Sequence, residues 1–468
     1  MALTVLIVYS IVLLALGLWI GRRVESSSTF FVAGRKLGPL LLFSTVLAAN
    51  IGAGSTVGAA GLGYRHGLSG WWWVGSAGIG TLLLAVWIGP RIWRLADEHD
   101  LLTAGDFLEF RYGKVVRAVI AILLWLGTLA ILAGQLIALS WILNVVAGIP
   151  KPIGCLIGGG VMTAYFTAGG LLTSAWVNMV QLVVLVIGFA VAFPWALSAA
   201  GGWAAVAASM PTQGHLEFWG GSSSWAYLAL LVPAFMVSPG LLQKVYGARD
   251  ERTIRLGVGA AAVALMAFAA IPPVLGMIAH AYDPSLANAE LALPLVLTTA
   301  LPVALGSIGL AAVFSAEMSS ADAILFMLAT SLSKDLYKRF VRPEADDRQV
   351  LRVARYAALV GGALGVALAI VLPSVIGSLS IFYSLLGVSL FVPVVAGLKS
   401  RRVGTPEVLA AIGSGVAVLI AARLAPWREA LGVSGWVASL SPNTWGLMAS
   451  VIVCVVVLVL RARRLRSQ

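Results

Sequence analysis

Thirteen apolar runs constrain this chain more than any other feature of its sequence. A helix that crosses a bilayer needs about 20 consecutive apolar residues, and only helices or closed barrels satisfy their backbone polar groups in lipid. Of the 468 residues, 60% are hydrophobic and 11% charged, which no soluble core requires. The runs span 2–21, 38–63, 69–90, 116–148, 151–166, 174–199, 224–243, 256–281, 303–332, 351–372, 374–398, 405–424 and 443–460. The sequence therefore predicts an all-α polytopic membrane protein with thirteen transmembrane helices.

The basic residues lie in short loops that follow the odd-numbered runs. These loops span 22–36, 91–117, 244–255, 334–355, 399–402 and 461–466. Because cytoplasmic loops carry an excess of Lys and Arg, we expect the N-terminus outside, the C-terminus in the cytoplasm, and a multi-pass position in the inner (plasma) membrane, surrounded by lipid. The first run has no basic residue before it and Arg22-Arg23 after it, which favours a retained helix over a signal peptide. Since the net charge of +12 is dispersed over these loops, we expect no nucleic-acid partner.

Two of the runs carry residues that interrupt a helix. In 38–63, Gly52 and Gly54 each lower helix propensity by about 1 kcal/mol relative to alanine, and Asn50 brings an amide into hydrocarbon. In 224–243, the sequence Ser238-Pro239-Gly240 removes a backbone donor and crowds the preceding turn. Interrupted helices at corresponding positions of two halves are typical of the binding sites of inverted-repeat transporters. The alternative is that the small residues permit close helix packing.

The ninth run offers oxygen ligands on one helical arc. At 100° per residue, Ala316, Ser319 and Ser320 share a face. Two hydroxyls and a loosened carbonyl suit a small hard cation that needs no carboxylate cage. The alternative is that each serine bonds back to a carbonyl one turn earlier.

Two carboxyl groups flank this arc on opposite sides. Glu317 and Asp322 lie inside the run, where ionisable groups are functional candidates. Glu317 is a candidate proton acceptor, a partner of an arginine, or a carboxyl kept neutral by burial, and Asp322 is either functional or a group that orders the helix.

Five motifs, in order along the chain, resemble the sodium/solute symporter family, and the resemblance covers nearly the whole chain. FFVAGRKLGPLLLFSTVLAANIGAGSTVG resembles the family's first loop and broken helix, and YFTAGGLLTSAWVNMVQ its signature, with a Gly169-Gly170 pair and Gln181. The others are TAGDFL with RYG at 103–113, PGLLQK at 239–244, and AEMSSADA with KDLYK at 316–338. One such motif would be weak, but several in register identify the chain as a bacterial-type, thirteen-helix member.

The resemblance implies a LeuT-like five-plus-five inverted repeat in a single transmembrane domain. One extra helix and loop (1–37) would precede the repeats 38–200 and 224–398, and two extra helices (399–468) would follow them. It further implies a sodium site. The implied ligands are the carbonyls of Ala48, Ile51 and Ala316 and the hydroxyls of Ser319 and Ser320.

By the same resemblance, the substrate would lie beside the break in 38–63. The candidate substrate-binding residues are Asn50, Gly52, Ser55, Trp73, Gln135, Phe235 and Ser238. For Trp71 and Trp72 we favour an interfacial belt. Gln135 is harder to assign to packing, because a buried amide requires hydrogen-bond partners. We expect Asn50 and Gln135 to shape substrate affinity rather than ion affinity.

One departure from the family pattern concerns ion release. The signature carries Asn178, preceded by Val177, where the family commonly has an aspartate on the inner sodium exit path. Release of the ion would then run without that carboxylate. We therefore place Asn178, Glu317 and Asp322 together as candidates for coupling and ion release.

The resulting interpretation is a secondary active transporter that imports a small organic solute with sodium. Alternatives are a proton-coupled symporter of the same fold and a solute-sensing homologue. No catalytic motif supports an enzyme. We expect sodium as the co-transported ion and no organic cofactor. We also expect a small-molecule substrate and function as a monomer. GWWWVGSA at 70–77 carries few hydroxyl-binding groups, which favours a monocarboxylate or amino acid over a sugar.

Overall fold

The computed structural model describes residues 2–21, 35–166, 171–220, 222–424 and 440–466. Arg22-Arg23 and the Gly169-Gly170 pair lie outside these ranges. The first elements are α1 (Ala2–Gly21), α3 (Pro39–Asn50), η2 (Gly54–Gly58), α4 (Ala59–His66), η3 (Gly67–Gly70), α5 (Trp71–Leu83), η4 (Leu84–Ile88), α6 (Gly89–Glu98), α7 (Ala104–Tyr112), α8 (Lys114–Ala147), α9 (Lys151–Phe166), α10 (Leu171–Ala199), α11 (Gly202–Ala208) and η5 (Gln213–Leu216). Then follow α12 (Ser222–Met236), α13 (Pro239–Tyr246), α14 (Glu251–Phe268), α15 (Ile271–Tyr282), η6 (Ala289–Leu291), α16 (Ala292–Thr299), α17 (Val303–Thr330), η7 (Ser331–Val341), α18 (Asp347–Val371), α19 (Val375–Lys399), α20 (Thr405–Leu424) and α22 (Pro442–Arg466).

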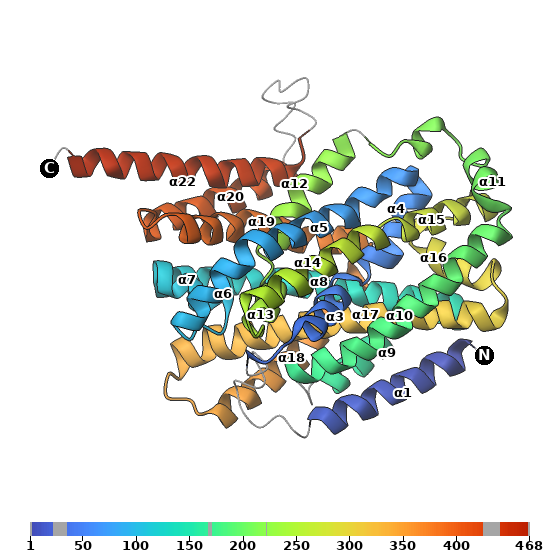
Figure 1. Cartoon of the computed structure of the whole chain (residues 1–468), viewed down its shortest axis with the longest axis horizontal. Coiled ribbons are helices and arrows are strands. Elements are labelled where there is room, and N and C mark those ends of the chain that lie inside the picture. The colour runs from blue at the N-terminus through green and yellow to red at the C-terminus, as the bar shows by residue number, and fades with distance from the viewer. Residues whose placement is uncertain (1, 22–34, 167–170, 221, 425–439, 467–468) are drawn as a thin grey trace.

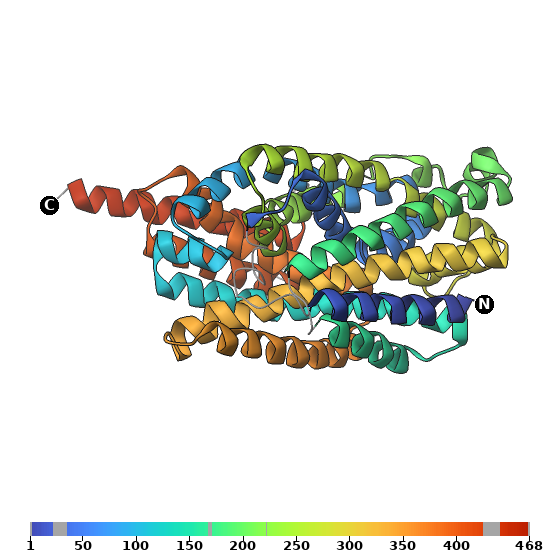
Figure 2. The same ribbon diagram turned by 60° about the horizontal axis from the view of Figure 1, so that its bottom comes forward.

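The long helices lie side by side in one bundle (Figures 1 and 2), and the prediction of an all-helical membrane protein is confirmed. Within the described ranges, ten helical stretches are long and apolar enough to cross a membrane by length and composition. α3 is shorter, because a break divides the second apolar run. The two termini lie at opposite ends of the bundle (Figure 1), as an odd number of crossings requires. The count of thirteen stays a prediction.

The predicted break in the second run is present. α3 ends at Asn50, Ile51 adopts extended dihedrals (φ −98°, ψ 102°), and the helix resumes as a π-turn at Gly54. Gly52 is required here because a Cβ would collide with Ser320 Oγ and lie 2.8 Å from Gln135 Oε1. The break therefore brings backbone, α17 and α8 into direct contact.

The second predicted break is also present, between Met236 and Pro239. Ser238 leaves the helical region (φ −54°, ψ 121°) and α13 begins with Pro239, where a proline lacks only an N–H that has no intrahelical partner anyway. A third interruption, at Ala269–Ala270 between α14 and α15, divides a run that we expected to be continuous. Pro272 and Pro273 lie in the first turn after it, and two adjacent prolines remove the donors that would have joined the halves.

α17 is the most deeply buried of the candidate spans in the described part of the chain. It packs against α10, α8, α18 and the broken helix α3. Polar groups near its middle are therefore shielded from lipid and face other helices.

Candidate functional site

The middle of α17 meets the end of α3 through two serine hydroxyls. Ser319 Oγ lies 2.9 Å from the carbonyl oxygens of both Ala48 and Ala316. Ser320 Oγ lies 3.0 Å from the Ile51 oxygen and 3.2 Å from that of Ala49. All five predicted sodium ligands are thus brought together at one point, each with at most 3% of its surface exposed.

The break in the helix leaves the Ala49 and Ile51 carbonyls at the end of α3 without the N–H partners of a continuous helix. The Ala53 N–H, which in a continuous helix would bond the Ala49 carbonyl, donates instead to Gln135 Oε1 at 2.9 Å. The Ser55 N–H donates to the Gly52 oxygen instead of the Ile51 oxygen. Carbonyls at the C-terminal end of a half-helix also carry the negative end of its dipole. The result is a cluster of oxygen ligands with partial negative charge.

The chemistry of this cluster fits a small monovalent cation. Its ligands are neutral carbonyl and hydroxyl oxygens, whereas divalent metal sites are typically built with carboxylates. Nowhere in the described residues do three or more His, Cys, Asp or Glu side chains gather in a group that could hold a metal ion. Each serine hydroxyl can turn its proton away and present lone pairs to an ion.

A cavity of about 60 Å³ lies directly beside this cluster. Its wall includes Ser320 and side chains from α5, α8, α12, α17 and α19. All seven predicted substrate-binding residues line it, namely Asn50, Gly52, Ser55, Trp73, Gln135, Phe235 and Ser238. The structure therefore brings the whole predicted set into one place, and their role in binding stays a prediction.

Aromatic side chains form one wall of this central cavity. The Trp73 ring meets Tyr227 at 5.4 Å and Tyr383 at 6.1 Å between centroids, and Tyr383 lies 5.1 Å from Phe235. Our sequence interpretation missed Tyr383. The available signal was a phenol in the middle of the apolar run 374–398, because a buried tyrosine hydroxyl usually has a hydrogen-bond partner.

The neighbouring tryptophans Trp71 and Trp72 are not among the residues that line the cavity. Trp72 packs against Trp219 and Phe218, at 4.5 and 5.4 Å between centroids. The interfacial role that we favoured for the two tryptophans stays a prediction.

Asn50 and Gln135 play different parts, so their alanine variants are expected to differ. Asn50 Nδ2 donates to Thr81 Oγ1 at 3.3 Å and lines the cavity, so Asn50→Ala should raise the half-saturating substrate concentration with little effect on that of sodium. Gln135 holds the Ala53 N–H at the break, so Gln135→Ala should raise both, against our expectation from sequence that both amides act on substrate alone. Uptake measured while the substrate or the sodium concentration is varied distinguishes the two variants. Equal effects of both variants on the half-saturating sodium concentration would contradict this assignment.

Glu317 lies on α17 away from the two serines and is fully buried. Its Oε1 is 2.7 Å from Thr56 Oγ1, which is itself 3.0 Å from the Gly52 oxygen. A threonine hydroxyl has one proton. Thr56 can therefore donate to only one of these two oxygens at a time, and a protonated Glu317 would donate to Thr56 Oγ1 and leave the Thr56 O–H for the Gly52 oxygen. The carboxyl is thereby tied to the broken segment.

The other two candidates for coupling occupy different surroundings. Asn178 on α10 is buried, and its Nδ2 donates to Thr45 Oγ1 at 3.3 Å, one turn before Ala48. Asp322 is 2% exposed and attracts Lys244 of α13, which is 1% exposed. That attraction supports the alternative that Asp322 orders the helices, and a coupling role for either residue stays a prediction.

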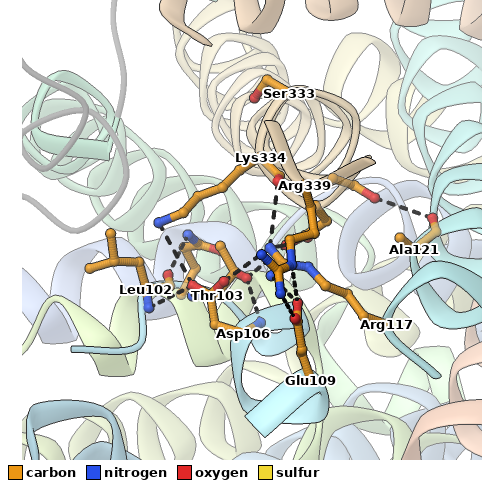
Figure 3. A network of polar contacts seen from close by, with 12 residues as sticks. Leu102, Thr103, Asp106, Glu109, Arg117, Ala121, Ser333, Lys334 and Arg339 are labelled. Carbon is orange, nitrogen blue, oxygen red and sulfur yellow. Dashed lines mark hydrogen bonds and ion pairs between the residues drawn. The ribbon is translucent and has the colours of Figure 1, made fainter. Parts of the chain in front are cut away.

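A network of ion pairs joins α7, the start of α8 and η7 (Figure 3). Arg117 lies at its centre, 2.7 Å from Asp335 and 2.9 Å from both Asp106 and Glu109. Arg339 also pairs with Glu109. Our sequence interpretation counted Arg117 only as part of a basic loop.

The carboxyl groups of α7 are held ionised by this network. Burial opposes ionisation of Asp106, but Lys334, Arg117 and the N–H groups of Leu102 and Thr103 hold its pKa below the ordinary value. Burial likewise opposes ionisation of Glu109, and hydrogen bonds from Arg339 and Arg117 outweigh it, so that its pKa is also lowered. Both carboxylates are therefore charged at neutral pH and pair with the central cation.

A smaller cavity of about 30 Å³ separates this network from the central one. Arg117, Asp335 and Thr103 line its far side, and Met327 lines both cavities. In this structure the central cavity thus meets Met327, the small cavity and the ion pairs in succession.

Comparisons with known proteins agree with this geometry. The model of the family described as "Sodium:solute symporter family" matches residues 30–415. The chain is 28% identical to the sodium/pantothenate symporter of Escherichia coli (strain K12), over 90% of each chain. It is 26% identical to the sodium/glucose cotransporter of Vibrio parahaemolyticus, over 75% of this chain and 72% of that protein. A solved outward-open, substrate-bound structure of a Na⁺-coupled sialic acid symporter has a TM-score of 0.81 at 18% identity, covering 98% of this chain and 97% of the other.

Proposed function

Since the chain belongs to the sodium:solute symporter family, we propose that it imports a small monocarboxylate or amino acid together with sodium. The coarser part of this statement, a sodium-coupled symporter with a LeuT-like fold and not an enzyme, follows from the family and from the solved symporter that shares the fold. The solute class, the ligands and the direction of transport are our proposal.

The position of Ser320 supports coupling between the ion and the solute. Its hydroxyl lies 3.0 Å from the Ile51 carbonyl in the ion cluster, and the same residue lines the central cavity. An ion at the cluster would hold α3 and α17 together and fix the wall that the solute contacts. The solute and the ion would then each favour the same arrangement of the break, which is what symport requires.

Two half-helices support an anionic or zwitterionic solute. η2 begins at Gly54 and α13 at Pro239 after Ser238, and Gly54 and Ser238 both line the cavity. The N-terminal end of a half-helix carries partial positive charge that favours a carboxylate. Because no Lys or Arg is among the lining residues, these two helix ends would be the positive groups that a carboxylate meets. The cavity of about 60 Å³ holds about four to six water-sized groups, which favours a small solute.

Alanine variants of the two proposed serine ligands are expected to differ in their effect on substrate affinity. Ser319→Ala should weaken apparent sodium affinity about tenfold, or ~1.4 kcal/mol for one ligand, without changing substrate affinity at saturating sodium. Ser320→Ala should weaken both. The measurement is sodium-driven uptake of candidate monocarboxylates and amino acids into proteoliposomes, with candidates drawn from a thermal-shift screen with and without sodium.

Ser307→Ala is the matched control, because its hydroxyl bonds the Val303 carbonyl at 2.7 Å away from the cluster. If both serine variants keep the sodium dependence of the parent, the ion site is elsewhere. Sodium-stimulated binding without accumulation would favour a solute sensor, and uptake driven by a proton gradient alone would favour proton coupling.

The orientation and the repeats complete the proposal. We place the C-terminal end of the bundle, with α7 and η7, in the cytoplasm and the N-terminus outside, because the basic loops gather at the former. Residues 38–200 and 224–398 would form the two repeats, since the break at 51–53 and the break at 237–238 fall in the first helix of each.

A further inference from the structure

A third and larger cavity lies at the basic end of the bundle. Its volume is about 630 Å³. It lies where α6, α7 and α19 end, and none of its lining residues lines the central cavity. The lining residues are Leu95, Glu98, His99, Phe110, Arg111, Gly397, Leu398, Lys399, Ser400 and Arg401. We call it the α6–α7–α19 cavity.

Positive charge dominates this cavity. Arg111, Lys399 and Arg401 face one carboxylate, Glu98, which is also within electrostatic reach of Arg94. No ion pair joins any of the three cations to a carboxylate elsewhere in the described ranges. Two segments distant in sequence, the end of α7 and the end of α19, therefore bring three cations to a cavity that holds one carboxylate.

Arg111 is already positioned by the fold. Its Nη2 donates to the Ser400 carbonyl at 2.8 Å, which fixes the guanidinium between α7 and the end of α19. Its Nε is buried and makes no hydrogen bond in this structure. A buried N–H without a partner is costly, and an acceptor with several oxygens at this place would remove that cost.

Aromatic side chains lie beside the basic groups of the cavity. Phe110 lines the cavity and is 47% exposed. The Lys399 ammonium lies 5.0 Å from the centre of the Trp87 ring. Tryptophan and lysine at the end of a transmembrane helix are typical of the membrane interface.

We propose that the α6–α7–α19 cavity binds the phosphate-bearing headgroup of an anionic phospholipid. The phosphate would accept from Arg111 and Lys399, with Arg401 at the opening, and an acyl chain would lie along the exposed Phe110 ring. Basic pockets between transmembrane helices on the cytoplasmic side are suited to such headgroups. A free phosphate shares the charge but not the affinity for the exposed Phe110 ring, which is why the lipid is the preferred source.

The test is native mass spectrometry of the detergent-purified full chain with phosphatidylglycerol or phosphatidylcholine. The parent should retain phosphatidylglycerol selectively. Lys399→Gln with Arg401→Gln should weaken that binding about 25-fold, or about fivefold for each charge lost, without touching the Arg111–Ser400 contact. Arg348→Gln with Arg352→Gln, two exposed arginines of α18 outside this cavity, is the charge-matched control and should bind as the parent does.

Three results would overturn the proposal. Equal retention by the two double variants would show that any loss of basic charge acts alike, and undiminished binding by the cavity variant would place the lipid elsewhere. Displacement of phosphatidylglycerol by inorganic phosphate, with stabilisation of the lipid-free protein by phosphate, would assign the site to the soluble anion. None of these readouts depends on sodium-coupled uptake, so the symport proposal stands or fails separately.

Discussion

Arg117→Leu is expected to destabilise the protein by about 3–5 kcal/mol, the typical cost of breaking a buried ion pair on one side. Arg117 is 5% exposed and contacts three carboxylates. Removing it leaves those carboxylates close together and short of their central cation. Arg339 and Lys334 compensate only in part, since Arg339 contacts Glu109 and Lys334 lies 3.7 Å from Asp106.

Thermal unfolding of the purified protein in detergent provides the measurement, with Arg94→Leu as the control. Arg94 pairs with Glu251 at 2.8 Å but is 58% exposed, so its loss should cost far less than the loss of Arg117, because exposed ion pairs contribute little to stability. We expect a much larger fall in melting temperature for Arg117→Leu. Equal melting temperatures for the two variants would mean that the network at the basic end contributes no more than a surface pair.

Glu317→Gln is expected to retain sodium-coupled transport, whereas Glu317→Lys abolishes it. An amide can donate to Thr56 Oγ1 as a neutral carboxyl does, and Thr56 then keeps its bond to the Gly52 carbonyl. A lysine would place a positive charge in a fully buried position beside a cluster that is suited to a cation, at a cost of several kcal/mol. Glu317→Ala should also lose transport, because it leaves Thr56 without this partner and opens a cavity.

Uptake into proteoliposomes, with membrane insertion and melting temperature as controls, separates these outcomes. Any pH dependence of the parent between pH 5 and 8 should be lost in Glu317→Gln. An inactive but normally folded Glu317→Gln would show that the charge itself is required. Glu317 would then be a direct coupling residue, and proton coupling would replace sodium coupling as the better proposal.

The breaks in the helices were predictable because their causes are local in the sequence. Gly52 and Gly54 weaken one helix and Pro239 ends another, and the structure interrupts the chain at both places. The arc of Ala316, Ser319 and Ser320 follows from helical periodicity alone. Their partners on α3 came from the resemblance to a family, since no local rule pairs residues about 270 positions apart.

The contacts that the sequence concealed are those between distant segments. Thr56 reaches Glu317 and Arg117 reaches Asp335 across more than 200 residues, and nothing near either residue signals its partner. Tyr383 was missed for the same reason, because its place beside Trp73 depends on how α19 packs. The interruption at Ala269–Ala270 had a local signal in Pro272-Pro273, which we did not weigh against the apolar length of the run.

Met327 lines both the central cavity and the small cavity beside the ion pairs. A thioether therefore lies between the two spaces. A thioether is flexible and fills irregular gaps, so a change of rotamer is enough to alter the connection between the two spaces. Oxidation to the sulfoxide makes the same side chain polar and chiral, and reductases reverse it. Met327 is thus the one described residue that lines both cavities, and its oxidation would change the polarity of the contact between them.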